Sequence, residues 1–249
     1  GDLAFGLQQV LQVARENNPR LRASMERIGA TRAREAGAGL LPDPSFQVGV
    51  MNLAIPEFSA SMPASMAPTF GAVQRFPVGG KLRLREEMAR QSTEMDVAAS
   101  EETWWEVRTQ VATVFYRIYQ MDRQLEVMEE TLSLLQDFET IARAMYAAGQ
   151  GRQADVLRAN VEVARMEAEI QRMDAARSGA AAQLNALLDQ PSATPVPAPI
   201  LGPLPSTVPD HETLMESAEE HRPALAKLRR ELDRAETRRL LAEKEIWPD

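Results

Sequence analysis

The fold is decided by residues 104–135, which read WWEVRTQVATVFYRIYQMDRQLEVMEETLSLL. Apolar side chains recur along this stretch at alternating spacings of four and three residues, which is the heptad pattern of a coiled-coil seam. The seam consists of Val107, Val111, Val114, Ile118, Met121, Leu125, Met128, Leu132 and Leu135, and Trp104 extends it by one position. Neither proline nor glycine occurs from residue 81 to residue 147. The pattern therefore predicts one continuous helix, which would be roughly 100 Å long at the usual rise per residue.

A second helix is expected from about Gln153 to Leu188, and Gly149 can end the first helix with a left-handed cap. The seam of the second helix is interrupted by one polar residue, Arg177. Its other members are Val156, Ala159, Val163, Met166, Ile170, Met173, Ala180, Leu184 and Leu187. Two adjacent helices with matching seams and a short turn form an antiparallel coiled-coil hairpin.

The returning helix would be about 54 Å long and would leave part of the longer helix uncovered. A candidate partner for that part is a helix of about 33 Å that starts at Pro19 and ends before Leu41. Asn18 is a suitable N-cap for this helix and Pro19 a suitable first residue, while residues 7–16 before the break also have a helical pattern. We expect the helix from Pro19 and the returning helix to stack end to end alongside the long one.

Residues 44–80 are almost free of charge, since Glu57 and Arg75 are their only charged side chains. Apolar residues alternate at both ends of this segment, as in strands that present one apolar face. The alternating residues are Phe46, Val48 and Val50 in the first strand and Phe70, Ala72, Gln74 and Phe76 in the second. The pattern predicts a β-hairpin with strands of about 9–11 residues, a length that spans a bilayer when tilted. A hairpin on a soluble domain fits the alternation equally well, but the lack of charge favours lipid.

A Pro-rich segment from Gln190 to Asp210 is expected to be extended and to pack along the helices. After it the opening pattern of the chain returns: residues 14–19 read ARENNP and residues 218–223 read AEEHRP. Likewise, residues 41–43 read LPD and residues 247–249 read WPD. These matches predict a duplicated protein, in which the second copy stops where its β-hairpin is expected to start. We therefore expect the chain to be the N-terminal half of a protein plus the start of its second repeat.

The predicted fold class is mainly α, with a long antiparallel coiled-coil helical hairpin, stacked shorter helices and one β-hairpin. The expected domain ranges are 1–43 for the N-terminal helices of the first repeat, 44–80 for the β-hairpin, 81–189 for the long helical hairpin, 190–212 for the Pro-rich connector and 213–249 for the truncated second repeat.

Composition excludes several classes of protein. The 249 residues include no cysteine, which excludes disulfide scaffolds, thiolate metal sites and cysteine nucleophiles. A formal net charge of −8 argues against a general nucleic-acid binder. No run of 18 apolar residues is present, so the sequence predicts no transmembrane helix.

No catalytic constellation is found, and we expect neither an enzyme nor a cofactor. Residues 78–81 read VGGK, but the flanking positions lack the glycine and the hydroxyl of a phosphate-binding loop. His211 and His221 both belong to regions expected near helix N-termini, and their spacing fits no zinc motif. Thioether binding of Cu(I) or Ag(I) by Met51, Met62 and Met66 is a less favoured alternative to an ordinary apolar loop.

The order of these elements resembles the TolC-like outer membrane factors, which are the exit ducts of Gram-negative efflux pumps and type I secretion systems. The most specific match is residues 143–159, RAMYAAGQGRQADVLRA, which is similar to the first helical hairpin tip of that family. Residues 76–83, FPVGGKLR, resemble the strand-to-helix junction of its heavy-metal (cation) efflux branch.

The resemblance implies a homotrimer in the outer membrane, with most of the chain in the periplasm. Each complete protomer would give four strands to a shared β-barrel, and Phe46, Val48, Val50, Phe70 and Phe76 would be membrane-strand residues. Open strand edges in lipid require such partners.

The tip residues Tyr146, Gly149 and Gly151 would contact a periplasmic adaptor (membrane fusion) protein and, through it, an inner-membrane transporter. Asp155 would help to close the tunnel aperture by pairing with a second helical hairpin, whose residues would follow Asp249. The implied function is a passive exit duct without catalysis. A soluble periplasmic adaptor and a coiled-coil scaffold are the alternatives, although the sequence lacks the Gly-rich β-domain halves that flank an adaptor hairpin.

Overall fold

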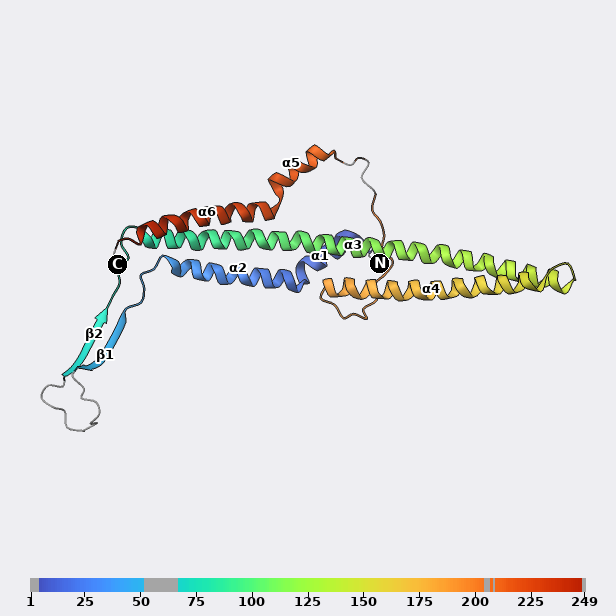
Figure 1. Ribbon diagram of the computed structural model, residues 1–249, viewed down its shortest axis with the longest axis horizontal. Coiled ribbons are helices and arrows are strands. Elements are labelled where there is room, and N and C mark those ends of the chain that lie inside the picture. The colour runs from blue at the N-terminus through green and yellow to red at the C-terminus, as the bar shows by residue number, and fades with distance from the viewer. Residues whose placement is uncertain (1–4, 52–66, 204–206, 208, 248–249) are drawn as a thin grey trace, which may run out of the picture. The chain divides into compact units, whose positions relative to one another are not determined.

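The computed structural model describes residues 5–51, 67–203, 207 and 209–247, which form helices α1 to α6 and strands β1 and β2 (Figure 1). Contacts divide the chain into two compact units. Unit 1 comprises Gly1–Ser24 and Ser100–His221, and unit 2 comprises Met25–Ala99 and Arg222–Asp249. None of the helices in the described ranges is both long and apolar enough to cross a membrane.

The predicted long helix and its returning partner are both confirmed. Helix α3 is continuous over Lys81–Ala147, a length of 67 residues, and α4 covers Gln153–Leu187, a length of 35 residues. Gly79 and Gly80 precede α3 with φ values of 71° and 79°, which L side chains rarely adopt. These two glycines therefore set the sharp entry of the chain into the long helix.

Unit 1 contains a hydrophobic core, built where α1 (Leu7–Asn17), α3 and α4 meet. The side chains of Phe115, Ile118 and Leu184 are completely buried there. The other buried members are Val10, Leu11, Ala14, Leu21, Val107, Val111, Val114, Ala180, Ala181, Leu188 and Val196. Four of the predicted seam positions of α3 thus lie in this core, whereas those from Met121 to Leu135 are only half-buried. The first seam residues of α3 are therefore shielded from solvent, whereas the later ones remain partly exposed.

Asn18 joins three elements of unit 1. Its Oδ1 accepts hydrogen bonds from the backbone N–H groups of Arg20 (3.0 Å) and Leu21 (3.4 Å), which is the predicted N-cap of α2 (Pro19–Ala38). Its Nδ2 donates to the carbonyl of Leu187 at 2.8 Å, so the start of α2 meets the end of α4. An ion pair between Arg22 and Asp189 lies at the same junction. The expected end-to-end stacking of these two helices is therefore confirmed at their junction.

The Pro-rich connector packs along unit 1 as predicted. The Nδ2 atom of buried Asn185 donates to the carbonyls of Ser192 (3.2 Å) and Thr194 (2.8 Å). Further along, the N–H of Ile200 donates to the carbonyl of Phe5 at 3.0 Å. These bonds satisfy backbone groups that a segment without secondary structure would otherwise leave unpaired.

Polar contacts connect the helices of unit 2. In it, α2 contacts α3 through an ion pair between Arg27 and Asp96 at 2.9 Å. Helix α6 (Pro223–Lys244) contacts α3 through two interactions: Gln91 Nε2 donates to Thr237 Oγ1 at 3.0 Å, and Arg230 pairs with Glu94 at 3.0 Å. Several large apolar side chains of the α6 segment, including Leu228 and Leu232, remain exposed, whereas Leu225 and Leu241 are half-buried.

The second helical pair has the same local order as the first, and its origin as a second repeat stays a prediction. Helix α5 covers His211–His221, and Arg222 separates it from α6, just as Asn18 separates α1 from α2. The two separating residues have similar backbone angles, with φ −58° and ψ 125° at Asn18 and φ −74° and ψ 117° at Arg222. Both precede proline, which disfavours the helical region for the residue before it. Only Asn18 also caps the next helix with its side chain.

Asp210 caps the start of α5, because its Oδ1 accepts the backbone N–H of Thr213 at 3.0 Å. Hydrogen bonds from the Thr213 side chain and backbone hold the pKa of Asp210 below its usual range.

Candidate functional site

The β-hairpin pairs β1 (Ser45–Met51) with β2 (Ala67–Val73) in an antiparallel ladder. Each strand has seven residues, so the expected 9–11 residues are not reached in the described part of the chain. The loop between them, with Met62 and Met66, lies outside the described residues. β2 ends at Val73, opposite Ser45, the first residue of β1, so Phe76 is not in the strand and its prediction as a strand residue is wrong.

The strand register places most of the large apolar side chains on one face of the hairpin, whereas Val73, 46% exposed, pairs with Ser45 on the other face. Phe46 pairs with Ala72, Val48 with Phe70 and Val50 with Pro68, and paired residues point to the same side of a sheet. Phe46, Val48 and Phe70 are each 77–78% exposed, and Val50 is 47% exposed.

The opposite face of the hairpin is formed by small or polar residues along most of its length. The pairs there include Gln47 with Gly71 and Gly49 with Thr69. A face of exposed aromatic and branched side chains opposed by a small, polar face is the pattern of a strand that separates lipid from an aqueous interior.

The tip of the α3–α4 hairpin is formed by a helix cap that requires glycine. The N–H of Gly149 donates to the carbonyl of Tyr146 (3.0 Å), and the N–H of Gln150 donates to that of Met145 (2.9 Å), which is the Schellman arrangement. Gly149 has φ 72°, in the left-handed region that this cap uses. A Cβ atom on Gly151 would lie 3.1 Å from the backbone nitrogen of Tyr146 and 3.2 Å from the carbonyl carbon of Met145. The turn therefore needs glycine at position 149 for its left-handed backbone and at position 151 for its close approach to the end of α3.

Asp155 lies in the first turn of α4, where a carboxylate interacts favourably with the helix dipole. Its Oδ2 accepts a hydrogen bond from Arg152 Nε at 3.3 Å, and the Arg152 side chain is 83% exposed. The side chain of Asp155 is 41% exposed and remains accessible to a further partner. The contacts of Tyr146, Gly149, Gly151 and Asp155 with other proteins stay predictions.

Arg177, the polar residue in the seam of α4, forms a three-way contact in unit 1. Its Nε lies 2.5 Å from Asp122 Oδ1 on α3, and its Nη2 donates to the carbonyl of Val196 in the connector at 3.1 Å. The side chains of Arg177 and Asp122 are only 24% and 14% exposed. Sequence reasoning identified the interruption of the seam but missed its partner, because Asp122 lies beside the seam residue Met121. Arg177 therefore ties both helices of the hairpin to the connector.

Replacing Arg177 with methionine is expected to destabilise the helical hairpin by about 1–3 kcal/mol, because Asp122 would lose its charged partner in a poorly hydrated position. The double variant Arg177→Met/Asp122→Leu should recover most of the lost free energy of unfolding, because it also removes the Asp122 charge that Arg177→Met leaves unpaired. The measurement is the free energy of unfolding from denaturant titrations followed by circular dichroism. Arg172→Gln, at an exposed arginine five residues earlier in α4, is the matched control. Equal losses for Arg177→Met and Arg172→Gln would contradict this role.

The histidines form no metal centre with other described residues, among which no group of three or more His, Cys, Asp or Glu side chains is placed to bind a metal ion. His211 begins α5, as expected for a residue near a helix N-terminus. His221 ends α5, where its Nδ1 lies 3.1 Å from the Ser217 carbonyl, and it directly precedes Arg222, the N-cap of α6, so it also lies next to a helix N-terminus as expected. The helix stops there because Arg222 precedes Pro223.

Known proteins with a matching sequence pattern or a similar fold are outer-membrane proteins. A family model described as "Outer membrane efflux protein" matches residues 10–190. The chain belongs to the outer membrane efflux protein family. This membership confirms the TolC-like resemblance and the predicted outer-membrane localisation, with a large periplasmic part. The family consists of transport proteins and is not a family of enzymes. No curated protein sequence matches the chain at a significant level.

Solved channels of similar fold cover nearly all of the chain. The outer-membrane channel OprN has a TM-score of 0.75 and 16% identity, with 97% of this chain and 56% of OprN covered. VceC from Vibrio cholerae has a TM-score of 0.73 and 18% identity, with 97% and 59% covered. The MtrE channel from Neisseria gonorrhoeae has a TM-score of 0.66 and 18% identity, with 93% and 53% covered. This member of the efflux family thus spans little more than half the length of those channels, and the likeness confirms the predicted mainly α fold.

Proposed function

We propose that the protein to which this chain belongs is the outer-membrane channel of a tripartite efflux or type I secretion system. It acts as a passive exit duct for substrates delivered by an inner-membrane pump, and it performs no catalysis. The observation that carries this proposal is the register of the β-hairpin, which gathers Phe46, Val48, Val50 and Phe70 on one exposed face. Family membership supports the same function.

The edges of the two-stranded hairpin support assembly into a closed barrel. Within the described residues β1 pairs only with β2, so each strand has an outer edge whose backbone groups no other described strand satisfies. Lipid does not tolerate such edges, and closure into a barrel removes them. We propose that three protomers each contribute strands to one barrel.

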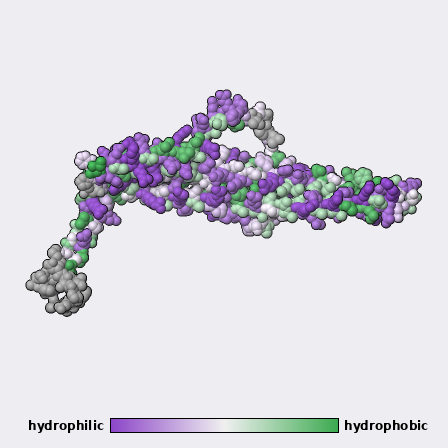
Figure 2. All heavy atoms as spheres, in the orientation of Figure 1, coloured by the Kyte–Doolittle hydropathy of each residue, from purple (hydrophilic) through white to green (hydrophobic). Residues whose placement is uncertain are grey.

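A second apolar stripe on α3 supports further helix packing. Its members lie on an exposed face, separate from the seam toward α4, at spacings of seven, four, three and four residues: Val127, Leu134, Phe138, Ile141 and Met145. Figure 2 shows apolar side chains among hydrophilic ones on the visible face of this helical hairpin. A stripe with heptad spacing fits a further helix. In the complete protein, helices of other hairpins would cover it and form the wall of a periplasmic tunnel.

The hairpin tip is proposed as the contact site for partner proteins. Tyr146 is 47% exposed beside the two glycines that shape the turn, so a periplasmic adaptor can approach the backbone closely there. Through the adaptor the channel would engage an inner-membrane transporter. Asp155 would close the aperture by pairing with a group on another helical hairpin.

The proposal is tested with the full-length gene product, purified in detergent and reconstituted into a planar bilayer. We expect a trimer by mass measurement and discrete single-channel conductance steps. A full-length protein that stays soluble and monomeric without detergent would instead favour the periplasmic adaptor or the coiled-coil scaffold.

A further inference from the structure

One end of unit 2 gathers basic side chains directly after the β-hairpin. Residues 74–85, which lead from β2 into α3, contain four basic residues and no acidic one, although the formal net charge of the chain is −8. The four are Arg75, Lys81, Arg83 and Arg85. The function proposed above does not account for this local excess of positive charge.

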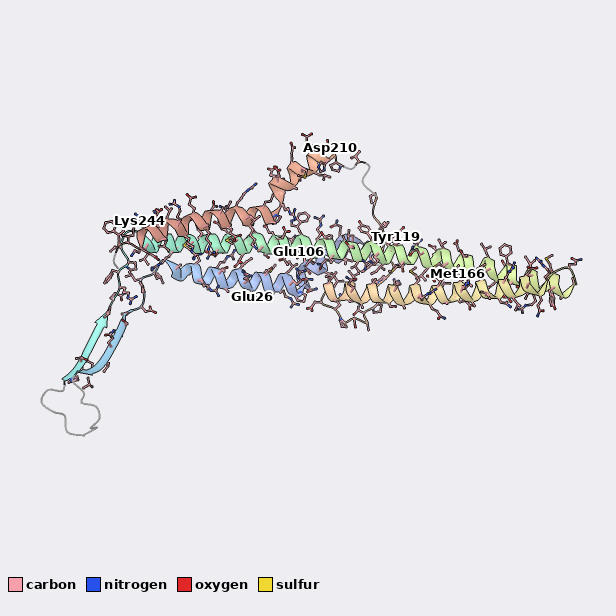
Figure 3. All side chains as sticks on the ribbon, in the orientation of Figure 1. Glu26, Glu106, Tyr119, Met166, Asp210 and Lys244 are labelled. Carbon is pink, nitrogen blue, oxygen red and sulfur yellow. The ribbon has the colours of Figure 1, made fainter. Side chains whose placement is uncertain are left out.

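Three contacts bring other segments of unit 2 to the same end. Gln74 Nε2 donates to the carbonyl of Pro42 at 2.7 Å, so the chain leaving α2 lies against the chain leaving β2. The buried Lys81 donates from Nζ to the carbonyl of Trp247 at 2.5 Å. A Cβ atom on Gly79 would lie 3.9 Å from Cδ of Lys244, and Figure 3 shows Lys244 at the end of α6, beside the start of α3. We call residues 40–43, 74–85 and 244–247 together the basic collar, which contains five basic side chains and two acidic ones, Asp43 and Glu245.

The basic collar also exposes large apolar side chains. Ile246 is 85% exposed, Leu40 67% and Trp247 61%. The others are Leu41, Phe76 and Val78, each about half exposed. Aromatic and aliphatic side chains interspersed with lysine and arginine are typical of surfaces at the boundary between membrane and water. Phe76 thus lies outside the strand but on a surface of this kind.

We propose that the basic collar binds the phosphate headgroups of anionic phospholipids at the bilayer surface. This inference rests on the proposed function, in which the adjacent β-hairpin enters the bilayer and holds the collar at headgroup depth. Arg75, Arg83 and Lys244 are exposed, and none of the three lies within ion-pair distance of a carboxylate in the described residues, although Arg83 interacts electrostatically with Glu87 one turn along α3. Their charges are therefore available to lipid phosphates, which arginine can bind through two parallel hydrogen bonds.

The test compares lipid binding to the full-length protein by native mass spectrometry, with phosphatidylglycerol and phosphatidylethanolamine added at equal concentrations. We expect the wild type to bind phosphatidylglycerol preferentially. In the variant R75Q/R83Q/K244Q, the ratio of bound phosphatidylglycerol to bound phosphatidylethanolamine should fall at least about tenfold. The reason is that each basic residue near an anionic surface raises the affinity roughly fivefold. The matched control is R158Q/R165Q/R172Q, which removes three exposed charges from α4 and should keep the preference.

The outcomes separate this inference from the proposed function. Equal preferences for phosphatidylglycerol in the two triple variants would overturn the proposal that the basic collar binds anionic phospholipids. Displacement of phosphatidylglycerol by inorganic phosphate at the same phosphorus concentration would overturn it too. Flotation with liposomes independently tests membrane insertion: a wild-type protein that fails to float contradicts the proposed function itself. If circular dichroism shows that R75Q/R83Q/K244Q misfolds, the single variant R75Q should still lose preference, by roughly fivefold. An unchanged preference in a folded R75Q would also count against the collar.

Discussion

Replacing Val48 with arginine is expected to prevent stable membrane insertion of the full-length protein. Val48 is 77% exposed on the apolar face of the hairpin, where it pairs with Phe70 near the middle of the ladder. An arginine on the lipid face near the centre of a bilayer costs about 2–4 kcal/mol per chain. A trimer would bear this cost three times. The measurement is the fraction of protein that floats with liposomes and the frequency of channel conductance steps.

Gln47→Arg is the matched control for Val48→Arg, because the two residues are neighbours on opposite faces of β1. An arginine at position 47 would face the proposed aqueous interior and should leave insertion intact while changing ion selectivity. If both variants insert as well as the wild type, the apolar face does not contact lipid. If only Gln47→Arg fails, the two faces of the hairpin have been assigned in reverse.

Replacing Phe115 with alanine is expected to cause the largest loss of stability in the helical part, about 3–5 kcal/mol. Phe115 is completely buried in the core of unit 1, and its ring centre lies 5.9 Å from that of Phe5. Truncation removes this apolar surface and leaves a cavity where α1 and α3 meet. The loss would appear as a lower midpoint in a urea titration of the detergent-solubilised protein, followed by far-ultraviolet circular dichroism.

Tyr116→Ala provides the control within the same helical turn, since Tyr116 is 47% exposed. Its loss should stay below about 1.5 kcal/mol, because an exposed side chain buries little area and its edge-on ring contact with Phe115, at 5.7 Å between centroids, contributes only modestly. Similar shifts for Phe115→Ala and Tyr116→Ala would mean that the packing around Phe115 does not stabilise unit 1.

The helices could be predicted closely because their signals are local. A glycine-free and proline-free run, the heptad spacing and the glycines at positions 79, 80 and 149 fix the ends of α3 at Lys81 and Ala147. Asn18 was likewise recognised as an N-cap from its position before Pro19.

The features that sequence reasoning missed depend on segments far apart in the chain. The partner of Arg177 lies 55 residues away, and the carbonyl that Asn18 binds belongs to Leu187. The alternation of Phe70, Ala72, Gln74 and Phe76 suggested a longer strand, but periodicity alone does not show where backbone pairing with β1 stops. In the same way, the difference between the apolar core of unit 1 and the polar packing of unit 2 depends on which helices meet.

The half-buried part of the α3–α4 seam allows the length of the helical hairpin to be changed without disturbing the core. Beyond Met121 the two helices meet in repeating half-buried layers, whereas the contacts that define the core and the connector lie nearer the other end of α4. Removing or adding one heptad in each helix would therefore change the hairpin by about 10 Å while leaving the core in place. The distal hairpin is in this sense a modular spacer, whose length could be changed to match the distance that the proposed efflux assembly would span.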